Sequence, residues 1–321
     1  MVATDLLKET LQIIGESDEE RLQSIIRSHL HTTYPLTAQL NIRVPMSKLS
    51  STYALIPCKG SIKGGSRKVE IDCGVACGHW EKLRLSTEEQ KTGFVNIEDH
   101  FSELLPTIGN VGLLTFQNGI LNSVADFQDM GKSILENLSE EPLCIGLYNA
   151  SSGLTGDVDR LTQALQGYVT EGICRTRLMM TTFITQLLQT NPQALWIHIA
   201  HSEGGMLAKM ALQGLRSQHS IHARNRLLAL AYGPVAPISS RVARDAINTY
   251  SKDDKAALRF AKQYLNDPAY DIRLVDSLVP KSEQCIVAGD HTFTKATYQK
   301  ALRDNLGTFR SLYKIYDAKK H

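Results

Sequence analysis

The stretch ALWIHIAHSEGG, residues 194–205, decides how this chain is interpreted. Its first seven residues are apolar almost throughout, which predicts a buried β-strand. The glycines at its end open a helix expected over residues 204–215. Ser202 therefore stands at a strand-to-helix turn. Because the turn is tight, the positions two before and two after this serine, Ala200 and Gly204, have to be small.

Outward from this turn, apolar strands alternate with helices over the last two thirds of the chain. This alternation predicts the α/β class, with a mostly parallel central sheet and helices on both faces. In such open sheets, reactive groups collect at the carboxyl ends of the strands. Further strands are predicted at residues 111–117, 143–149, 227–232, 245–250 and 284–288, and helices at 124–138, 156–166, 172–190, 256–265 and 295–316.

The first hundred residues have a different pattern and carry no chemical motif. The spacing of apolar residues predicts helices at 6–14 and 20–30 and short strands at 39–44, 52–57 and 69–75. We therefore predict two parts, an α+β N-terminal extension over residues 1–105 and a main domain over residues 106–321, with the boundary near Pro106. The first part fits a cap, a partner-binding element or an extension of the main sheet.

Composition excludes several classes of function. The formal net charge is only +2 over 321 residues, whereas a nucleic-acid-binding surface usually has a strongly basic patch. No apolar run reaches the roughly 18 to 20 residues of a membrane-spanning helix. Residues 1–20 lack the basic start and apolar core of a cleaved export signal. We expect a soluble, cytoplasmic protein, with export by a route that needs no such signal left open.

The six cysteines are scattered along the chain. This distribution favours free thiols in a reducing compartment. Cys73 and Cys77 have His79 nearby, but a metal site would need a second pair of ligands at regular spacing, and none is evident. We therefore predict that this cluster is structural and that the protein needs no metal and no cofactor.

The turn from Ala200 to Gly205 resembles the nucleophile elbow of the α/β-hydrolases, usually written Gly-x-Ser-x-Gly. Ala200 departs from the strict pattern but keeps the position small. The resemblance implies that Ser202 is a nucleophile. The alternative is that Ser202 only caps the following helix, since serine is a favoured N-cap residue. The preceding His201, the two glycines and the apolar strand together favour the nucleophile.

A serine nucleophile needs a base and an acid, which follow it in this fold in the order Ser, acid, His. His291 fits the base, because it follows the last predicted strand. His201 is the local competitor, and its side chain is expected to point away from the reaction site and to pack. His198, inside a strand, is expected to be a buried, hydrogen-bonded histidine.

The acid has two adjacent candidates, Asp253 and Asp254, which follow the strand predicted at residues 245–250. Asp254 is preferred by resemblance, because related hydrolases often carry Ser-x-x-Asp at this point. Asp271 and Asp276 are weaker candidates. The alternative role for the Asp253–Asp254 pair is to cap the helix that follows, as any aspartate there would tend to do.

Two backbone amides usually stabilise the oxyanion of acyl transfer. The fold implies the amide of Glu203 as one donor and the amide of Ile120, after the first strand of the main domain, as the other. Many α/β-hydrolases have a histidine where this chain has Asn118. This difference leaves the Ile120 amide in place, but any role that the histidine side chain has in those proteins does not carry over. The alternative is a plain Asn-Gly turn at Asn118–Gly119.

The α/β-hydrolase resemblance covers about residues 111–316. A narrower resemblance, to an uncharacterised family of chlamydia-type bacteria, rests on residues 148–153, 167–170, 201–205 and 232–234, and it implies no known substrate. We expect a serine hydrolase that cleaves a small-molecule or lipid ester, of carboxylesterase or lipase type. An acyltransferase, thioesterase or peptidase with the same triad, and a non-catalytic binding protein of this fold, are the alternatives.

Overall fold

The computed structural model describes most of the chain from residue 39 onward. The helices predicted at residues 6–14 and 20–30 lie outside the described residues, as does the predicted boundary at Pro106. The residues described are 39–48, 56–64, 67–76, 83–100, 103, 111–138, 143–168, 170–191, 193–215, 217–286 and 288–315.

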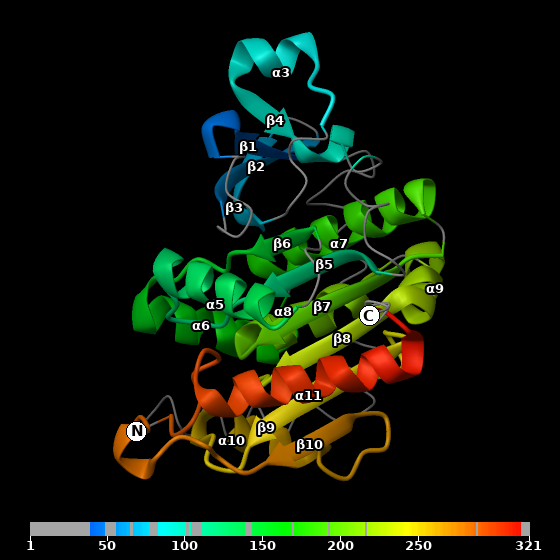
Figure 1. Cartoon of the computed structure of the whole chain (residues 1–321). Helices are drawn as coiled ribbons and strands as arrows, with labels where there is room; N and C mark the ends of the chain where they lie inside the picture. Colours follow the sequence, from blue (N-terminus) through cyan, green and yellow to red (C-terminus); the bar gives the residue numbers. More distant parts are fainter. Residues whose placement is uncertain are drawn as a thin grey trace.

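One ten-stranded sheet runs through the described residues, in the order β10-β9-β8-β7-β5-β6-β3-β2-β1-β4 (Figure 1). All neighbouring strands from β10 to β6 are parallel. Their carboxyl ends therefore meet at one edge, which is where the predicted nucleophile lies. The parallel strands are β5 (Val111–Gln117), β6 (Cys144–Leu147), β7 (Leu195–His201), β8 (Leu227–Tyr232), β9 (Asp245–Ser251) and β10 (Asp271–Val275).

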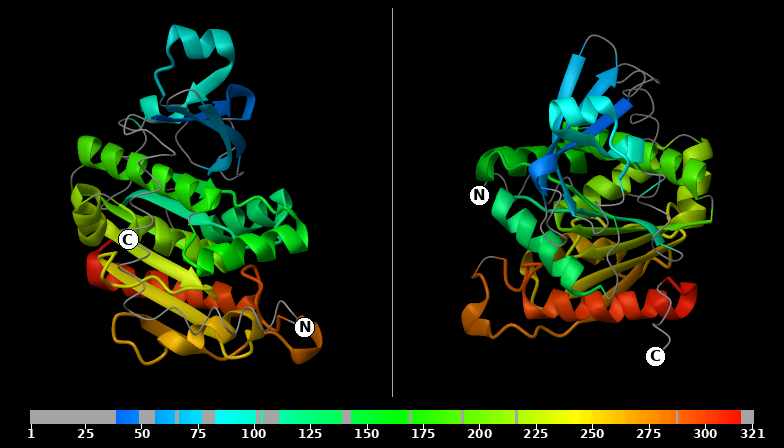
Figure 2. Two further views of the ribbon diagram at one scale, coloured as in Figure 1. Left: turned by 180° about the vertical axis from the view of Figure 1, so that it is seen from behind. Right: turned by 45° about the horizontal axis from the view of Figure 1, so that its top comes forward.

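Helices cover both faces of this sheet (Figures 1 and 2), so the predicted fold class is confirmed. Successive side chains of a strand point to opposite faces. On β5, Leu114 and Phe116 share a buried cluster with helices α5 and α11, whereas Leu113 packs in another cluster with α7, α8 and α9. The helices are α5 (Val124–Glu136), α6 (Gly153–Leu165), α7 (Glu171–Thr190), α8 (Glu203–Gln213), α9 (Ser217–Arg226), α10 (Lys255–Ala261) and α11 (Ala296–Tyr313).

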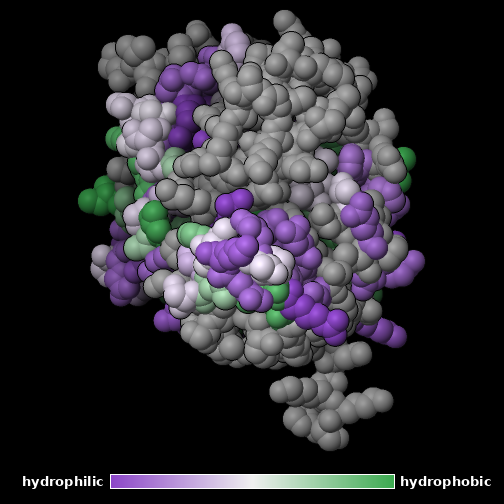
Figure 3. Space-filling model, turned by 90° about the horizontal axis from the view of Figure 1, so that it is seen from above, coloured by the Kyte–Doolittle hydropathy of each residue, from purple (hydrophilic) through white to green (hydrophobic). Residues whose placement is uncertain are grey.

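The described N-terminal strands continue the sheet as an antiparallel extension beyond β6. Strand β3 (Arg67–Ala76) pairs with β6, and β2 (Ile56–Gly64), β1 (Gln39–Pro45) and β4 (Phe94–Asn96) follow in turn. The short helix α3 (Thr87–Thr92) lies at the far end. The described surface around it is mainly hydrophilic (Figure 3). The described N-terminal strands thus extend the main sheet. The function of residues 1–105 stays a prediction.

The expectation that all cysteines are free thiols is wrong for Cys73, which is disulfide-bonded. Cys58 lies directly opposite Cys73 in the register of the β2–β3 hairpin. Sequence spacing does not reveal this juxtaposition, because it depends on where the hairpin turns. A disulfide is more typical of an oxidising compartment than of the cytoplasm, and the cytoplasmic location stays a prediction.

The strand predicted at residues 284–288 is wrong. Cys285 and Gly289 form only an isolated bridge, and Ile286 is 90% exposed. The last parallel strand is instead β10, which the sequence analysis did not identify. β10 is the edge strand and is half exposed, so it needs no apolar run. Helix α9 was also missed, because it has no apolar stripe.

Gly146 on β6 marks a close contact within the core. The rings of Phe116 and Phe127 stack with centroids 4.9 Å apart. A Cβ atom placed on Gly146 would lie 2.4 Å from each of these two rings. Both rings are buried and closely packed, so they have little room to move away.

We therefore expect Gly146→Ala to lower the free energy of unfolding by about 1–3 kcal/mol through overpacking. Gly307→Ala is the matched control, because nothing lies within 4 Å of its added Cβ in the middle of α11. That control should be neutral or stabilising by up to about 1 kcal/mol. Urea unfolding of both variants measures the difference, and equal stabilities would contradict the packing described for Gly146.

Candidate active site

Ser202 occupies a strained turn between β7 and α8. Its φ of 55° and ψ of −124° lie in a region that L-residues rarely adopt. Its side chain makes no capping bond to α8, so the capping alternative does not describe its geometry. Gly204 is required here because a Cβ would lie 2.7 Å from the carbonyl oxygen of Gln117. The turn thus holds the Ser202 hydroxyl at the carboxyl edge of the sheet.

The Ser202 hydroxyl lies within hydrogen-bond distance of His291. His291 Nε2 is 2.9 Å from Ser202 Oγ, and its Nδ1 is 2.8 Å from Asp254 Oδ2. The buried carboxylate can only accept, so Nδ1–H donates to Asp254 and Nε2 is left to accept the proton of Ser202. Three segments that are far apart in the chain therefore meet in one linear arrangement.

The two adjacent aspartates have different environments. Asp254 is fully buried against His291, whereas Asp253 accepts a bond from Gln284 Nε2 at 3.0 Å. Asp254 is also the N-cap of α10, since its Oδ1 accepts from the amide of Ala257 at 2.8 Å. The two roles weighed for this residue therefore coexist on its two oxygens.

The weaker acid candidates lie elsewhere. Asp271 pairs with Arg273, and Asp276 pairs with Lys252. Asp276 has a side chain that is 84% exposed. Neither position offers the burial that makes a carboxylate an effective partner for an imidazole.

His201 packs against the predicted base. Its ring centroid is 4.8 Å from that of His291, and its Nε2–H donates to the His291 carbonyl oxygen at 2.7 Å. Burial, with the nearby His291 as a second cause, lowers the pKa of His201 to about 3. His201 is therefore neutral and supports the backbone of the base. Packing was predicted, but the hydrogen bond could not be read from the sequence.

His198 is buried in β7 as predicted. Its Nδ1 lies 2.8 Å from Thr115 Oγ1, which also accepts a bond from Trp196 Nε1 at 2.7 Å. Among the described residues, no hydrogen-bond partner lies near its buried Nε2. The prediction of a buried, hydrogen-bonded histidine is therefore confirmed for Nδ1 but not for Nε2. Burial lowers its pKa to about 3, so it is also neutral.

The loop after β5 passes directly over the nucleophile. A Cβ atom on Gly119 would lie 2.5 Å from Ser202 Cβ, so only glycine fits there. Asn118 is fully buried, and its side chain bonds to the backbone of Asn149, with Oδ1 accepting from the amide at 2.7 Å. Asn118 is therefore more than a turn residue. The roles of the Ile120 and Glu203 amides as oxyanion donors stay predictions.

Glu203, the residue after the nucleophile, belongs to the same network. It is buried, and it accepts a hydrogen bond from Asn149 Nδ2. Burial is the largest influence on its carboxyl group and raises its pKa. Through Asn149, the loop after β5 is therefore tied to the start of α8. From the sequence, only a backbone role was expected for Glu203 and no role in the site for Asn149.

Asp157 anchors the adjoining loops from beneath. It is fully buried and accepts bonds from the amides of Leu121 and Ser152, at 3.0 and 2.8 Å, and from Arg160. Burial alone would raise its pKa, but the donors around it, led by Ser151, outweigh burial and lower the pKa. Leu121, which has a positive φ of 58°, is thereby held in place.

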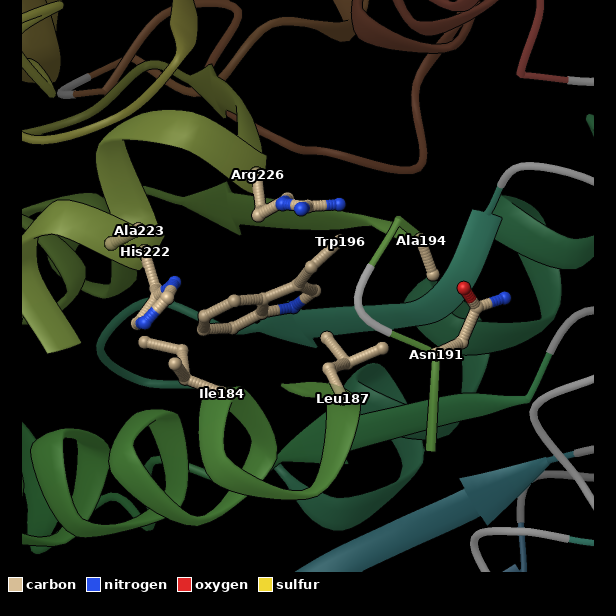
Figure 4. A pocket seen from close by; sticks show the side chains of 8 residues that line it. All are labelled: Ile184, Leu187, Asn191, Ala194, Trp196, His222, Ala223 and Arg226. Atoms are coloured by element: carbon tan, nitrogen blue, oxygen red, sulfur yellow. The ribbon is translucent and has the colours of Figure 1, made fainter. Parts of the chain in front are cut away.

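A small apolar pocket lies at the opposite end of β7. Trp196 forms its floor near the amino end of the strand, and residues of α7 and α9 surround it (Figure 4). Ser202 follows the carboxyl end of the same strand, so this pocket is separate from the candidate site. Its lining residues are Ile184, Leu187, Asn191, Ala194, Trp196, His222, Ala223 and Arg226.

Among the described residues, no group of three or more His, Cys, Asp or Glu side chains is arranged to hold a metal ion. Within the same residues, no helix has both the length and the apolar character required to cross a bilayer.

Comparisons with known proteins yield structural likenesses alone. No protein-family model matches the chain, and no curated protein matches its sequence. A lidless α/β serine hydrolase from Xanthomonas campestris superposes with a TM-score of 0.45 at 11% identity, covering 82% of this chain and 96% of that one. The resemblance to a chlamydia-type family gains no support here.

Two cutinases are also structurally similar. A Trichoderma reesei cutinase, in complex with a phosphonate inhibitor, has a TM-score of 0.33 at 13% identity over 67% of this chain and 88% of its own. A cutinase-like protein from Cryptococcus has a TM-score of 0.31 at 17% identity over 65% and 95%. All three scores lie below 0.5, so the interpretation of the site rests on its own geometry.

The two neutral buried histidines predict a pH dependence of stability. Unfolded histidines titrate near 6.5, whereas His198 and His201 have pKa values of about 3 when folded. Between these values the unfolded state binds more protons, so stability is complete above pH 6.5 and falls as the pH drops. In this range each histidine adds about 1.4 kcal/mol per pH unit to the slope of the unfolding free energy against pH.

We therefore expect His198→Gln to reduce the slope of unfolding free energy against pH by about 1.4 kcal/mol per unit below pH 6.5. Urea unfolding from pH 8 to pH 5 measures this slope. At pH 8 the histidine is neutral in both the folded and the unfolded state. The difference in unfolding free energy between variant and wild type at that pH therefore reports the packing cost of the substitution alone. An unchanged slope would contradict the buried, neutral state of His198.

Proposed function

We propose that this protein is a serine hydrolase that cleaves carboxylic esters through a covalent acyl-enzyme. The observation that carries the proposal is the hydrogen-bonded chain from Ser202 through His291 to Asp254. An alcohol becomes a useful nucleophile only when a base accepts its proton, and the base works best when a carboxylate orients it. The strained turn supports the same role, since strain of this kind clusters at active sites.

The reaction begins when Ser202 Oγ attacks the ester carbonyl carbon and its proton passes to His291 Nε2. Negative charge then develops on the former carbonyl oxygen, where the amides of Glu203 and Ile120 are the proposed donors. Each such donor typically contributes about 2.7–4 kcal/mol to lowering the barrier. Asp254 stabilises the imidazolium that forms.

The tetrahedral intermediate collapses when the bond to the leaving oxygen breaks and His291 returns its proton to that oxygen. The alcohol departs, and Ser202 carries the acyl group. A water molecule then attacks the acyl carbon while His291 takes its proton. The bond between the acyl carbon and Ser202 Oγ breaks, His291 returns the proton to Oγ, and the carboxylic acid is released. Ser202, His291 and Asp254 are the proposed nucleophile, base and acid of these two steps, and their hydrogen bonds support these roles. The acceptor in the second half could equally be an alcohol in an acyltransferase.

We expect a fluorophosphonate probe to label wild-type protein and to leave Ser202→Ala unlabelled, because the probe reacts with an activated serine hydroxyl. Labelling is read by gel fluorescence and the site by mass spectrometry of the peptide. A wild type that stays unlabelled, or a Ser202→Ala variant labelled equally well, would remove the hydrolase proposal in favour of a binding protein.

The neighbouring aspartates offer a matched pair for the same assay. Asp254→Asn should lower ester turnover by roughly 10³- to 10⁴-fold, because an amide cannot hold the imidazole in the required tautomer. Asp253→Asn should change turnover by less than about threefold, since this side chain contacts Gln284 instead.

Turnover of p-nitrophenyl esters, thioesters and peptides by the wild type, with and without alcohol acceptors, separates an esterase from the alternatives.

A further inference from the structure

The carboxylate of Asp254 has a second side-chain donor besides His291. Tyr298 on α11 donates its hydroxyl proton to Oδ2, the same oxygen that accepts His291 Nδ1–H. The Tyr298 and Asp254 side chains are both fully buried. The mechanism proposed above uses the carboxylate but gives no role to this tyrosine.

We propose that Tyr298 is a positioning residue of the site, whose hydroxyl fixes the Asp254 carboxylate and sets how strongly that carboxylate binds the His291 imidazole. The inference rests on the proposed function, because it assigns Tyr298 to the same triad. The hydrogen bonds of Tyr298 within the described residues go to Asp254 and Ser251, and neither goes to Ser202. It acts through Asp254.

The direction of the Tyr298 hydrogen bond is determined by its neighbours. The amide of Ser251 lies 3.3 Å from Tyr298 Oη and donates to it. The single hydroxyl proton is therefore left for Asp254. Burial raises the pKa of Tyr298 well above its ordinary value, and the charge of Asp254 is the second cause of this shift. Tyr298 thus remains a donor throughout the range in which a hydrolase works.

The carboxylate has little freedom to rotate. Oδ1 accepts from the amide of Ala257, and Oδ2 is shared between His291 and Tyr298. Gly233 closes the remaining side. A Cβ atom on this residue would lie 2.6 Å from Asp254 Oδ2, 2.8 Å from Tyr298 Oη and 3.1 Å from His291 Nδ1. Only backbone without a side chain fits against this junction.

The two donors to Oδ2 compete for the same negative charge. A hydrogen bond to a carboxylate stabilises its charged form and makes it a weaker partner for a second donor. Removal of the tyrosine hydroxyl should therefore strengthen the interaction of Asp254 with a protonated His291. His291 would then keep its proton to a higher pH, so a smaller fraction of it would be free to accept a proton on the acidic side of the pH profile.

The other charged or titratable groups near His291 would not produce the shift in His291 protonation that is expected for Tyr298→Phe. His201 packs on its ring and bonds to its carbonyl oxygen, but it is neutral. Asp290 precedes it in the chain, and its Oδ2 accepts bonds from the hydroxyls of Ser251, Ser277 and Thr297. Asp254 is thus the carboxylate that a change at Tyr298 would affect first.

Tyr298→Phe tests the inference, with Tyr232→Phe as the matched control. Tyr232 lies in the same buried aromatic cluster, with ring centroids 5.8 Å apart, but its hydroxyl contacts Asn305 rather than the triad. We expect Tyr298→Phe to lower kcat for a p-nitrophenyl ester by about tenfold with KM unchanged, because the carboxylate that orients the imidazole loses the hydrogen bond that fixes it, and misplacement of a catalytic group is costly. Tyr232→Phe should stay within about twofold of wild type.

The pH profile separates this role from a merely structural one. In Tyr298→Phe the acidic limb of the kcat/KM profile should move to higher pH by about half a unit to one unit, and in Tyr232→Phe it should not move. Tyr298→Phe introduced into Asp254→Asn should have little further effect, because residues that act through one group are not additive. Equal profiles for the two phenylalanine variants, or additive losses, would overturn the inference.

A readout that does not need turnover distinguishes failure of the inference from failure of the proposed function. The protonation midpoint of His291 can be followed by NMR of histidine-labelled protein. An upward shift in Tyr298→Phe but not in Tyr232→Phe supports the role of Tyr298 even if the wild type fails to hydrolyse any ester. Identical midpoints in wild type and both variants overturn it even if the wild type is an active hydrolase.

Discussion

The strained turn at Ser202 is the constraint on which the rest of the site depends. A non-glycine residue with a φ of 55° costs of order 1–3 kcal/mol and persists only when its surroundings hold it. Here the surroundings come from both neighbouring strands. The Ser202 amide donates to the carbonyl oxygen of Tyr232 on β8, at 3.1 Å, and Gly204 packs against the carbonyl oxygen of Gln117 on β5. The parallel sheet therefore supports the geometry of its own central turn.

The acid side of the site shows how one buried residue serves two purposes. Asp254 ends the bend after β9 and caps α10 through one oxygen, while the other oxygen faces His291. A buried carboxylate is costly unless its lone pairs are satisfied. The helix amide, the imidazole and the Tyr298 hydroxyl together meet that requirement. Folding of α10 and α11 and assembly of the site thus depend on the same contacts.

The residues around Ser202 are held by two asparagine side chains. Asn118 pairs with the backbone of Asn149, and the Asn149 side chain donates to the carboxyl group of Glu203, so the loops after β5 and β6 and the start of α8 form one connected network. Such a network can place backbone amides rigidly, which is what stabilisation of a developing oxyanion needs. The loop contacts of Asn118 account for a buried asparagine at this position.

Sequence alone determined the fold class, the position of the turn and the residue types able to do the chemistry. Apolar strands such as β7 and small residues around Ser202 leave a local signal, because burial and tight backbone packing restrict which side chains are allowed. The edge strand β10 left none, since none of its residues is fully buried. Tertiary structure alone decided that Asp254 rather than Asp253 faces His291, that Cys73 is disulfide-bonded, and that Tyr298 and Asn149 join the site. Most of these contacts join residues that are distant in the chain. The choice between the two aspartates depends on which of two neighbouring side chains the bend turns toward His291. Neither property produces a periodic pattern in the sequence.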